Sequence, residues 1–210
     1  MLKERFNNQA ELNTYIKEQT ERKIKGYLTA SERDQLERLI KNPKEYIKEI
    51  KETPKGKPIV TNIEELKRPC QEVNKNDNLI QLIQDLKDTL EAKHGLGISA
   101  NQIGVNKRIS YVKIPKFQDK NGKWNYNEYI LINAKIIEKD KPIKVQGEMC
   151  LSFPGISIIT KRYVFCTIEY YNEKFELQTA IAQDLEALTI QHECDHQNGI
   201  TIFDRKWRAK

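Results

Sequence analysis

The residues best suited to chemistry lie near the C-terminal end, in the segment QHECDH at positions 191–196. His192 and His196 are four positions apart, so on a helix both imidazoles lie on one face and can reach one cation. Glu193 lies beside His192, where it can accept a proton from water at that cation. This pattern predicts a metal-dependent hydrolase. The structural alternative is a chance match on an ordinary helix.

Two histidines do not complete a catalytic metal site, which usually has three protein ligands and an open position. Positions 197–210 offer only Asp204 as an acidic side chain and contain no histidine. Cys150 is a strong candidate, because it lies in a segment bounded by glycine and proline between strand-like runs. A thiolate binds iron, zinc, nickel or cobalt well. Alternatively, Cys150 is a small buried hydrophobic residue.

A third segment, GLGISANQ at positions 95–102, contains features that suit a ligand site. Gly95 and Gly97 allow the backbone to approach another chain or a ligand closely, and Gln102 offers an amide donor. Taken alone this signal is weak, because such loops are often simple turns.

The elements that must position these segments follow an α+β pattern. Apolar residues with a helical period predict an amphipathic helix over about 77–93, and the pattern is helical again over 184–197. Between them lie strand-like runs at Arg108–Ile114, Tyr129–Ile137, Ile156–Thr160, Val164–Tyr171 and Phe175–Ala182, with a hairpin turn at Asn121-Gly122. We therefore expect mainly antiparallel strands packed around a central metal-binding HExxH helix.

The N-terminal part has a different character. Residues 1–56 are rich in lysine and glutamate with sparse apolar spacing, which predicts a charged helical extension of two or three polar helices. Positions 53–56 (TPKG) have the composition of a linker. We expect the main domain at 57–206 and a short basic tail at 207–210.

Composition and charge limit the cellular setting. The formal net charge is +6, which favours polyanions such as ribosomal RNA as neighbours, although a solvated lysine- and glutamate-rich surface is the commoner explanation. Neither a signal peptide nor an apolar stretch near the roughly 20 residues of a membrane span is visible in the sequence. We expect a cytosolic protein without a membrane or specific DNA partner, whose four cysteines are thiols or metal ligands.

Together and in this order, the three segments resemble the motifs of the peptide deformylase family. The family pattern is Gly-x-Gly-x-Ala-Ala-x-Gln, then Glu-Gly-Cys-x-Ser, then Gln-His-Glu-x-Asp-His; here the segments are GLGISANQ, EMCLS (148–152) and QHECDH. The resemblance continues in positions 58–70, in Asn198-Gly199 and in positions 203–205, so that it covers roughly residues 57–206.

The resemblance implies a function and a set of site residues. The enzyme would remove the formyl group from N-formylmethionyl nascent peptides and release formate. It would use one divalent metal ion, often Fe²⁺ in this family and replaceable by Zn²⁺, Ni²⁺ or Co²⁺. The implied residues are Cys150, His192 and His196 as metal ligands, Glu193 as the acid–base group, Gln102 and the Leu151 N–H as oxyanion donors, Gly97 and the strand near Ile156 as backbone partners of the substrate, and Ile98 and Ile190 as walls of the methionine pocket.

Three positions depart from the family pattern. Met149 replaces the glycine before the ligand cysteine, which would add backbone strain or reshape the pocket. Ser99 replaces the first alanine of the loop, a change that is conservative in size. Asp184 stands where the family usually has glycine, and we expect it to serve as a helix N-cap.

Two other functions are compatible with parts of the pattern. An HExxH metalloendopeptidase would usually draw its third ligand from beyond the helix, where this chain offers little. A deformylase-shaped peptide-binding protein with weak or no turnover is suggested by Met149 and the long extension. N-formylmethionine implies bacterial, phage or organellar translation, and the basic N-terminal helices or tail could contact the ribosome.

Overall fold

The chain divides into two compact units, Met1–Thr53 and Pro54–Lys210. The computed structural model describes residues 14–15, 17–18, 30–41 and 56–208. In the first unit, helix α2 (Ala30–Lys41) buries Leu36 completely, and Tyr15 packs against it. Elsewhere in the expected N-terminal extension, residues 14–15 and 17–18 are helical and residue 56 is described, and the others lie outside the described residues.

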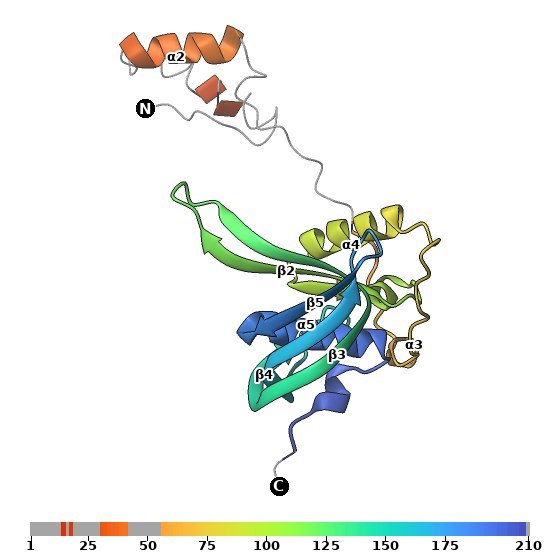
Figure 1. The fold of residues 1–210 in the computed structure, drawn as a ribbon. Coiled ribbons are helices and arrows are strands. Elements are labelled where there is room, and N and C mark those ends of the chain that lie inside the picture. Colours follow the sequence, from red (N-terminus) through yellow and green to blue (C-terminus); the bar gives the residue numbers. More distant parts are fainter. Residues whose placement is uncertain (1–13, 16, 19–29, 42–55, 209–210) are drawn as a thin grey trace. The chain divides into compact units, whose positions relative to one another are not determined.

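The second unit contains a five-stranded sheet in which every strand is antiparallel to its neighbours and spatial order follows chain order (Figure 1). Its strands are β1 (Gly97–Ser99), β2 (Ile109–Gln118), β3 (Trp124–Met149), β4 (Ser157–Tyr171) and β5 (Leu177–Gln183). The helices are α3 (Ile63–Leu66), α4 (Ile80–Lys93), α5 (Asp184–Gln197) and the 3-10 helices η2 (Ala100–Ile103) and η3 (Ile202–Arg205). The antiparallel sheet expected from the sequence is confirmed.

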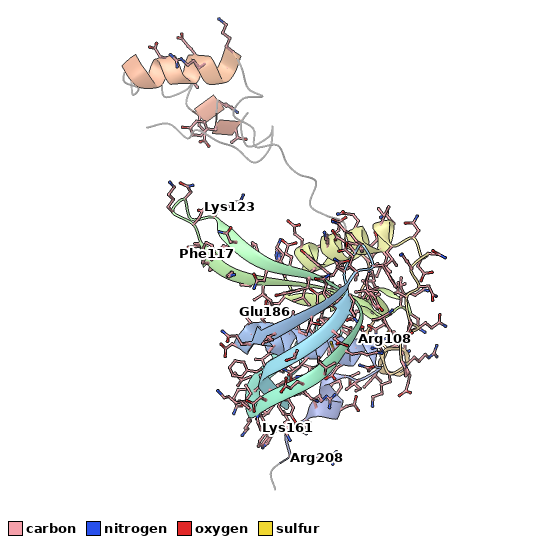
Figure 2. The ribbon with its side chains drawn as sticks, in the orientation of Figure 1. Arg108, Phe117, Lys123, Lys161, Glu186 and Arg208 are labelled. Carbon is pink, nitrogen blue, oxygen red and sulfur yellow. The ribbon has the colours of Figure 1, made fainter. Side chains whose placement is uncertain are left out.

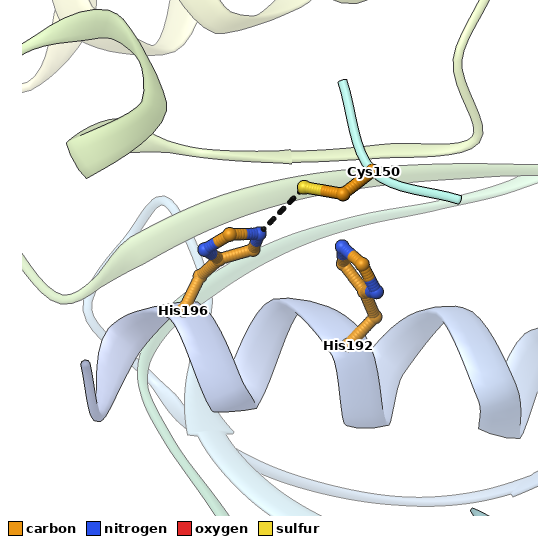
Figure 3. Close-up of side chains that lie close together, drawn as sticks. All are labelled: Cys150, His192 and His196. Carbon is orange, nitrogen blue, oxygen red and sulfur yellow. Dashed lines mark hydrogen bonds between the residues drawn. The ribbon is translucent and has the colours of Figure 1, made fainter. Parts of the chain in front are cut away.

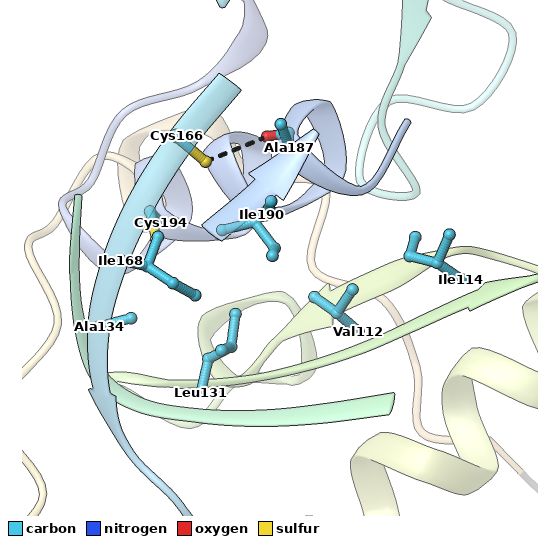
Figure 4. Packing of buried hydrophobic residues seen from close by; sticks show 10 residues of the cluster. Val112, Ile114, Leu131, Ala134, Cys166, Ile168, Ala187, Ile190 and Cys194 are labelled. Carbon is cyan, nitrogen blue, oxygen red and sulfur yellow. Dashed lines mark hydrogen bonds between the residues drawn. The ribbon is translucent and has the colours of Figure 1, made fainter. Parts of the chain in front are cut away.

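Helix α5 packs on the sheet through its apolar side. Ala187, Ile190 and Cys194 lie in one buried cluster with Val112, Leu131 and Ile168 from the strands (Figure 4). A second cluster joins Leu86 and Leu90 of α4 to β1 and β2. These two clusters hold α5 and the 95–102 loop against the same sheet. Of the described helices, none is both long and apolar enough to cross a membrane.

The structure joins two strand-like runs that the sequence separates. Ile156–Thr160 and Val164–Tyr171 belong to the single strand β4, because Lys161 and Arg162 interrupt the apolar pattern without ending the strand. Arg162 is only 3% exposed and is paired with carboxylates, so a charged side chain occupies an inward position. Helix α4 also begins at Ile80, three residues later than expected.

The predicted turn at Asn121-Gly122 joins β2 to β3. Gly122 adopts a φ of 77°, which favours glycine, and Asp119 accepts hydrogen bonds from the backbone N–H groups of Asn121 and Lys123. The two strands extend together as a hairpin, with Phe117 and Lys123 exposed near its end (Figure 2). The end of this hairpin extends away from β1, which pairs with the other end of β2 at Ser110–Val112 (Figure 1).

Candidate metal centre

Helix α5 and the end of β3 bring three metal-ligating side chains together. His192 and His196 lie one helical turn apart, with ring centroids 4.9 Å from each other. Cys150 follows β3 and points towards both rings, with its Sγ 3.2 Å from His196 Nε2 (Figure 3). One ligand atom from each residue lies within 4.8 Å of the other two. The two-histidine pattern and Cys150 therefore converge on one point.

A buried ionic network fixes the orientation of His192. Its Nδ1 lies 2.7 Å from Glu148 Oε1, which leaves Nε2 directed to the shared point. Arg162 donates to both oxygens of Glu148, and Thr160 also donates to this carboxylate. Burial alone would raise the pKa of Glu148, but the hydrogen bonds from His192 and Arg162 hold that pKa well below its usual range. Glu148 is therefore a carboxylate anion beside the ligand ring, an arrangement common around metal-bound histidines.

The charges around the two rings suit a bound cation. Burial opposes a positive charge on His192, yet contacts with Cys150 and Glu148 raise its pKa, so positive charge is favoured there. Burial and the neighbouring positive groups lower the pKa of His196, which keeps that ring in the neutral form that binds metals. A thiolate, two imidazoles and a negative neighbour fit a divalent transition metal.

The other three cysteines are in a different environment. Burial raises the pKa of Cys70 and Cys166 to about 11, and it also raises that of Cys194. These side chains lie among core residues or against backbone carbonyl groups. They are therefore protonated thiols that contribute to packing, and Cys150 is the only cysteine in the convergent group of described residues.

Glu193 lies beside this group, on the side of β1. It is 2% exposed, and burial raises its pKa above the usual range, whereas His192 and Ser99 act in the opposite direction. A buried carboxylate with a raised pKa is suited to accept and return a proton near neutral pH. Gly97 packs against it so closely that a β-carbon there would lie 2.5 Å from Glu193 Oε1. The glycine in β1 is thus needed for the carboxylate to fit.

Gln102 and Leu151 flank Cys150 with hydrogen-bond donors. The backbone N–H of Ser99 donates to Gln102 Oε1 at 2.9 Å, which fixes the orientation of the amide group. Gln102 Nε2 then points to Cys150 Sγ at 3.4 Å and Ser152 Oγ at 3.2 Å. The Leu151 N–H has no hydrogen-bond acceptor among the described residues. Both donors are placed where they could stabilise an oxyanion.

A cavity of about 940 Å³ opens onto these groups. Its lining includes the site residues Gly97, Gln102, Cys150, Leu151, His192 and Glu193 and the apolar residues Leu96, Val145, Met149, Phe153, Leu185 and Leu188. Four residues named from the sequence are not part of this lining: Ile98 and Ile190 are fully buried in the core clusters, Ile156 is 41% exposed outside the cavity, and the metal-ligand candidate His196 is 1% exposed. The side chains of Ile98 on β1 and Ile190 on α5 instead pack into the core.

The structure also resolves two departures from the family pattern. Met149 is not among the residues with positive φ and is 68% exposed, so its side chain reshapes the cavity lining without backbone strain. Asp184 was expected to be an N-cap, but Gln183 holds that position. Asp184 instead has a φ of 51°, a left-handed conformation that glycine adopts more readily. This explains why a glycine suits that position.

The partners that orient the site residues were not predicted from the sequence. Glu148 belongs to the EMCLS motif, where no role is implied for it, and Arg162 lies between the two strand-like runs that the sequence predicts. Arg162 also donates to Asp195 at 2.5 Å, and Arg205 reaches the same carboxylate at 2.6 Å. A charged residue in the middle of an otherwise apolar strand pattern is the signal that could have indicated a buried ion pair.

Comparisons with known proteins agree with this geometry. Residues 57–210 match the family model of polypeptide deformylase. A relative described as peptide deformylase 2 from Clostridium perfringens is 39% identical over 142 residues, which cover 68% of this chain and 86% of the relative. A Met-Ala-Ser-bound class I type b peptide deformylase from Acinetobacter baumannii is 26% identical, with a TM-score of 0.64. The match covers 72% of this chain and 99% of that structure. A peptide deformylase from Synechococcus elongatus in complex with actinonin is 28% identical, with a TM-score of 0.63. The match covers 75% of this chain and 81% of that structure.

Proposed function

The chain belongs to the polypeptide deformylase family, and we propose that its cavity is where the formyl group is removed from N-formylmethionyl nascent peptides. The observation that carries the proposal is the convergence of Cys150, His192 and His196 beside the buried carboxylate of Glu193. The products are formate and a peptide with a free methionine amine. Residues 57–206 form the catalytic domain in this proposal, with residues 1–56 as an extension and 207–210 as a basic tail.

Cys150, His192 and His196 would hold one divalent metal ion. Fe²⁺ is the first choice, and Zn²⁺, Ni²⁺ and Co²⁺ fit the same ligand set. When bound, such an ion supplies Lewis acidity towards water and the formyl oxygen. Glu148 supports this assignment, because its hydrogen bond with His192 Nδ1 keeps Nε2 available as the ligand atom.

The chain's own groups perform the proton transfers and the charge stabilisation. Glu193 accepts a proton from the attacking water and later passes it to the nitrogen of the leaving methionine amine. The Gln102 amide and the Leu151 N–H donate to the formyl oxygen as negative charge develops on it. Removal of one such donor costs on the order of 3 kcal/mol of activation free energy.

The edge of the sheet provides the binding surface for the peptide. Among the described strands β1 pairs only with β2, so its other side is open to an extended peptide that adds a strand next to Gly97. Backbone pairing of this kind tolerates varied sequences, which suits nascent chains. Leu96 and Leu188 line the adjacent cavity and replace Ile98 and Ile190 as the proposed apolar wall for the methionine side chain.

Formate release from formyl-Met-Ala-Ser, measured anaerobically with a defined metal, tests the function. We expect turnover by the wild-type chain and its loss in Glu193→Gln, because the amide cannot take up the proton. Thr89→Val, a substitution in α4 away from the cavity, is the control and should keep turnover. Cleavage within an unformylated peptide would instead indicate an endopeptidase, and metal binding without any turnover would indicate a peptide-binding protein.

A ribosome contact follows from the substrate and the charge. We propose that the protein acts in the cytoplasm on emerging chains and that residues 1–56 or the basic tail contact the ribosome. The net charge of +6 supports this. Ribosome pelleting of the full chain and of a variant without residues 1–55 tests the N-terminal part, and equal pelleting of both would exclude it.

A further inference from the structure

Glu193 is the end of a chain of buried neutral hydrogen bonds. Ser99 Oγ lies 2.7 Å from Glu193 Oε2, and Ser110 Oγ lies 2.7 Å from Ser99 Oγ. Gln197 Nε2 donates to Ser110 Oγ at 2.9 Å. The exposed fractions of Ser99, Ser110 and Gln197 are 1%, 0% and 0%, so water does not compete for these bonds. We refer to these three residues as the serine chain.

The groups at its two ends, the Gln197 amide and the Glu193 carboxylate, determine the direction of the hydrogens in the serine chain. The Gln197 amide donates to both Ser110 Oγ and the Leu131 carbonyl, and its Oε1 accepts from the Ala134 N–H, so the amide cannot be flipped without losing bonds. Ser99 donates its single hydrogen to Glu193, whose Oε2 at 2.7 Å is closer than its backbone oxygen at 3.3 Å. Ser110 accepts from Gln197, and in its bond with Ser99 the Ser110 hydroxyl is therefore the donor.

The two oxygens of the Glu193 carboxylate are thereby made different. Oε2 accepts the hydrogen bond from Ser99, whereas Oε1 lies next to Gly97 and has no donor among the described residues. We propose that the serine chain holds Glu193 through Oε2, so that Oε1 is the oxygen that takes and returns the proton during deformylation. This proposal rests on the function proposed above, since it assigns a role to residues behind the same base.

The serine chain connects three elements through one carboxylate. Ser99 belongs to β1, Ser110 to β2, and Gln197 and Glu193 to α5. Because all three members are uncharged, they orient Glu193 without neutralising its charge. Position 99 is alanine in the family pattern described above, and an alanine has no hydroxyl to donate. Ser99 is therefore a positioning residue that this chain adds to the pattern.

Steady-state kinetics with formyl-Met-Ala-Ser test the proposal. We expect Ser99→Ala to lower kcat about tenfold, the effect of losing one hydrogen bond to a charged group, with KM changed less than about threefold. Ser110→Ala should have a smaller effect of the same kind, because it acts only through Ser99. The double variant should then resemble Ser99→Ala, since members of one series are not additive. Ser99→Thr keeps the hydroxyl and should retain most of kcat.

The control is Thr89→Val, which also removes a fully buried hydroxyl, but one that donates to the Asp85 carbonyl in α4 and accepts from the Lys57 N–H. It should lower the melting temperature as Ser99→Ala does and leave kcat unchanged. Crystal structures of Ser99→Ala and wild type supply a readout besides activity, and we expect the Glu193 carboxylate to rotate or become disordered in the variant. Unchanged kcat in Ser99→Ala, additive losses in the double variant, or an unmoved carboxylate would each overturn the proposal. Loss of turnover in Glu193→Gln in those cases would show that the deformylase function still holds.

Discussion

Two hydrogen-bonded networks support helix α5, one on the side that faces β1 and one on the side that faces β4. The first network is neutral and the second is ionic. On the side of β1, the serine chain is neutral and ends at Oε2 of Glu193. On the side of β4, Arg162 lies between the carboxylates of Glu148 and Asp195, and the network ends at Nδ1 of His192. The first network reaches the proposed base, and the second reaches a proposed metal ligand.

The difference follows from what each end group has to do. A base must keep its affinity for a proton, so uncharged partners that orient the carboxylate and leave its charge in place are appropriate. A ligand ring must hold one tautomer and one direction against a cation, and an anionic partner strengthens its donation to the metal. The ionic network buries three charged groups together. Loss of one of them therefore leaves the others as buried charges without a partner and destabilises the fold.

Replacement of Arg162, the positively charged residue at the centre of the ionic network, should have the largest effect, and this effect is on stability. Arg162→Met leaves Glu148 and Asp195 without their shared partner, and we expect a loss of about 3–5 kcal/mol in the free energy of unfolding. Urea unfolding measures this loss. The matched control is Arg205→Met, which removes a second partner of Asp195 whose side chain is 39% exposed, and it should cost about 1 kcal/mol. Equal losses of unfolding free energy for the two variants would contradict the expectation that the buried Arg162 stabilises the fold more than the partly exposed Arg205.

On the side of the serine chain, a methyl group added at position 97 should have the strongest effect on activity. Gly97→Ala places a β-carbon 2.5 Å from Glu193 Oε1, so the carboxylate or β1 must move. We expect kcat/KM for formyl-Met-Ala-Ser to fall about a hundredfold, because small displacements of catalytic groups have effects of this size. Gly122→Asn is a control in the hairpin turn, where no atom lies within 4 Å of an added β-carbon. Normal activity in the Gly97→Ala variant would show that the close packing is irrelevant.

The carboxylate that joins the ionic network to His192 should determine metal affinity. Glu148→Gln keeps the shape and an acceptor oxygen but removes the negative charge behind the ring. We expect metal affinity to fall about 10–100-fold, as for other partners of ligand histidines. Competition with a chelator measures the change. Glu186→Gln, which alters another α5 carboxylate bonded to Asn127 and Tyr129, should leave metal affinity unaltered.

The sequence predicts the groups that touch the metal better than the groups that hold them. His192, His196 and Cys150 have distinctive chemistry, and the two histidines have a fixed helical spacing, so their convergence could be anticipated. Ser110 and Gln197 are common residue types without a spacing rule, and their bonds depend on how β2 meets α5. Arg162 was overlooked because its burial depends on two carboxylates 14 and 33 positions away. Long-range pairing of this kind leaves no local pattern.

The absence of a local sequence pattern also explains why the predicted walls of the pocket were wrong. The residues that do line the pocket lead to the smallest predicted effect. The family resemblance implied Ile98 and Ile190, but both side chains pack into the core, whereas Met149 and Leu185 line the cavity and are 68% and 45% exposed.

Neither network reaches Met149, so Met149→Ala should leave stability and metal affinity intact. We expect its kcat/KM to fall about threefold to tenfold for formyl-Met-Leu-Ser relative to formyl-Met-Gly-Ser, because the thioether can contact a bulky second residue. Ile137→Ala, a similarly exposed apolar position elsewhere on β3, should leave that ratio unchanged. An unchanged ratio in Met149→Ala would mean that this side chain covers the cavity without contacting the peptide.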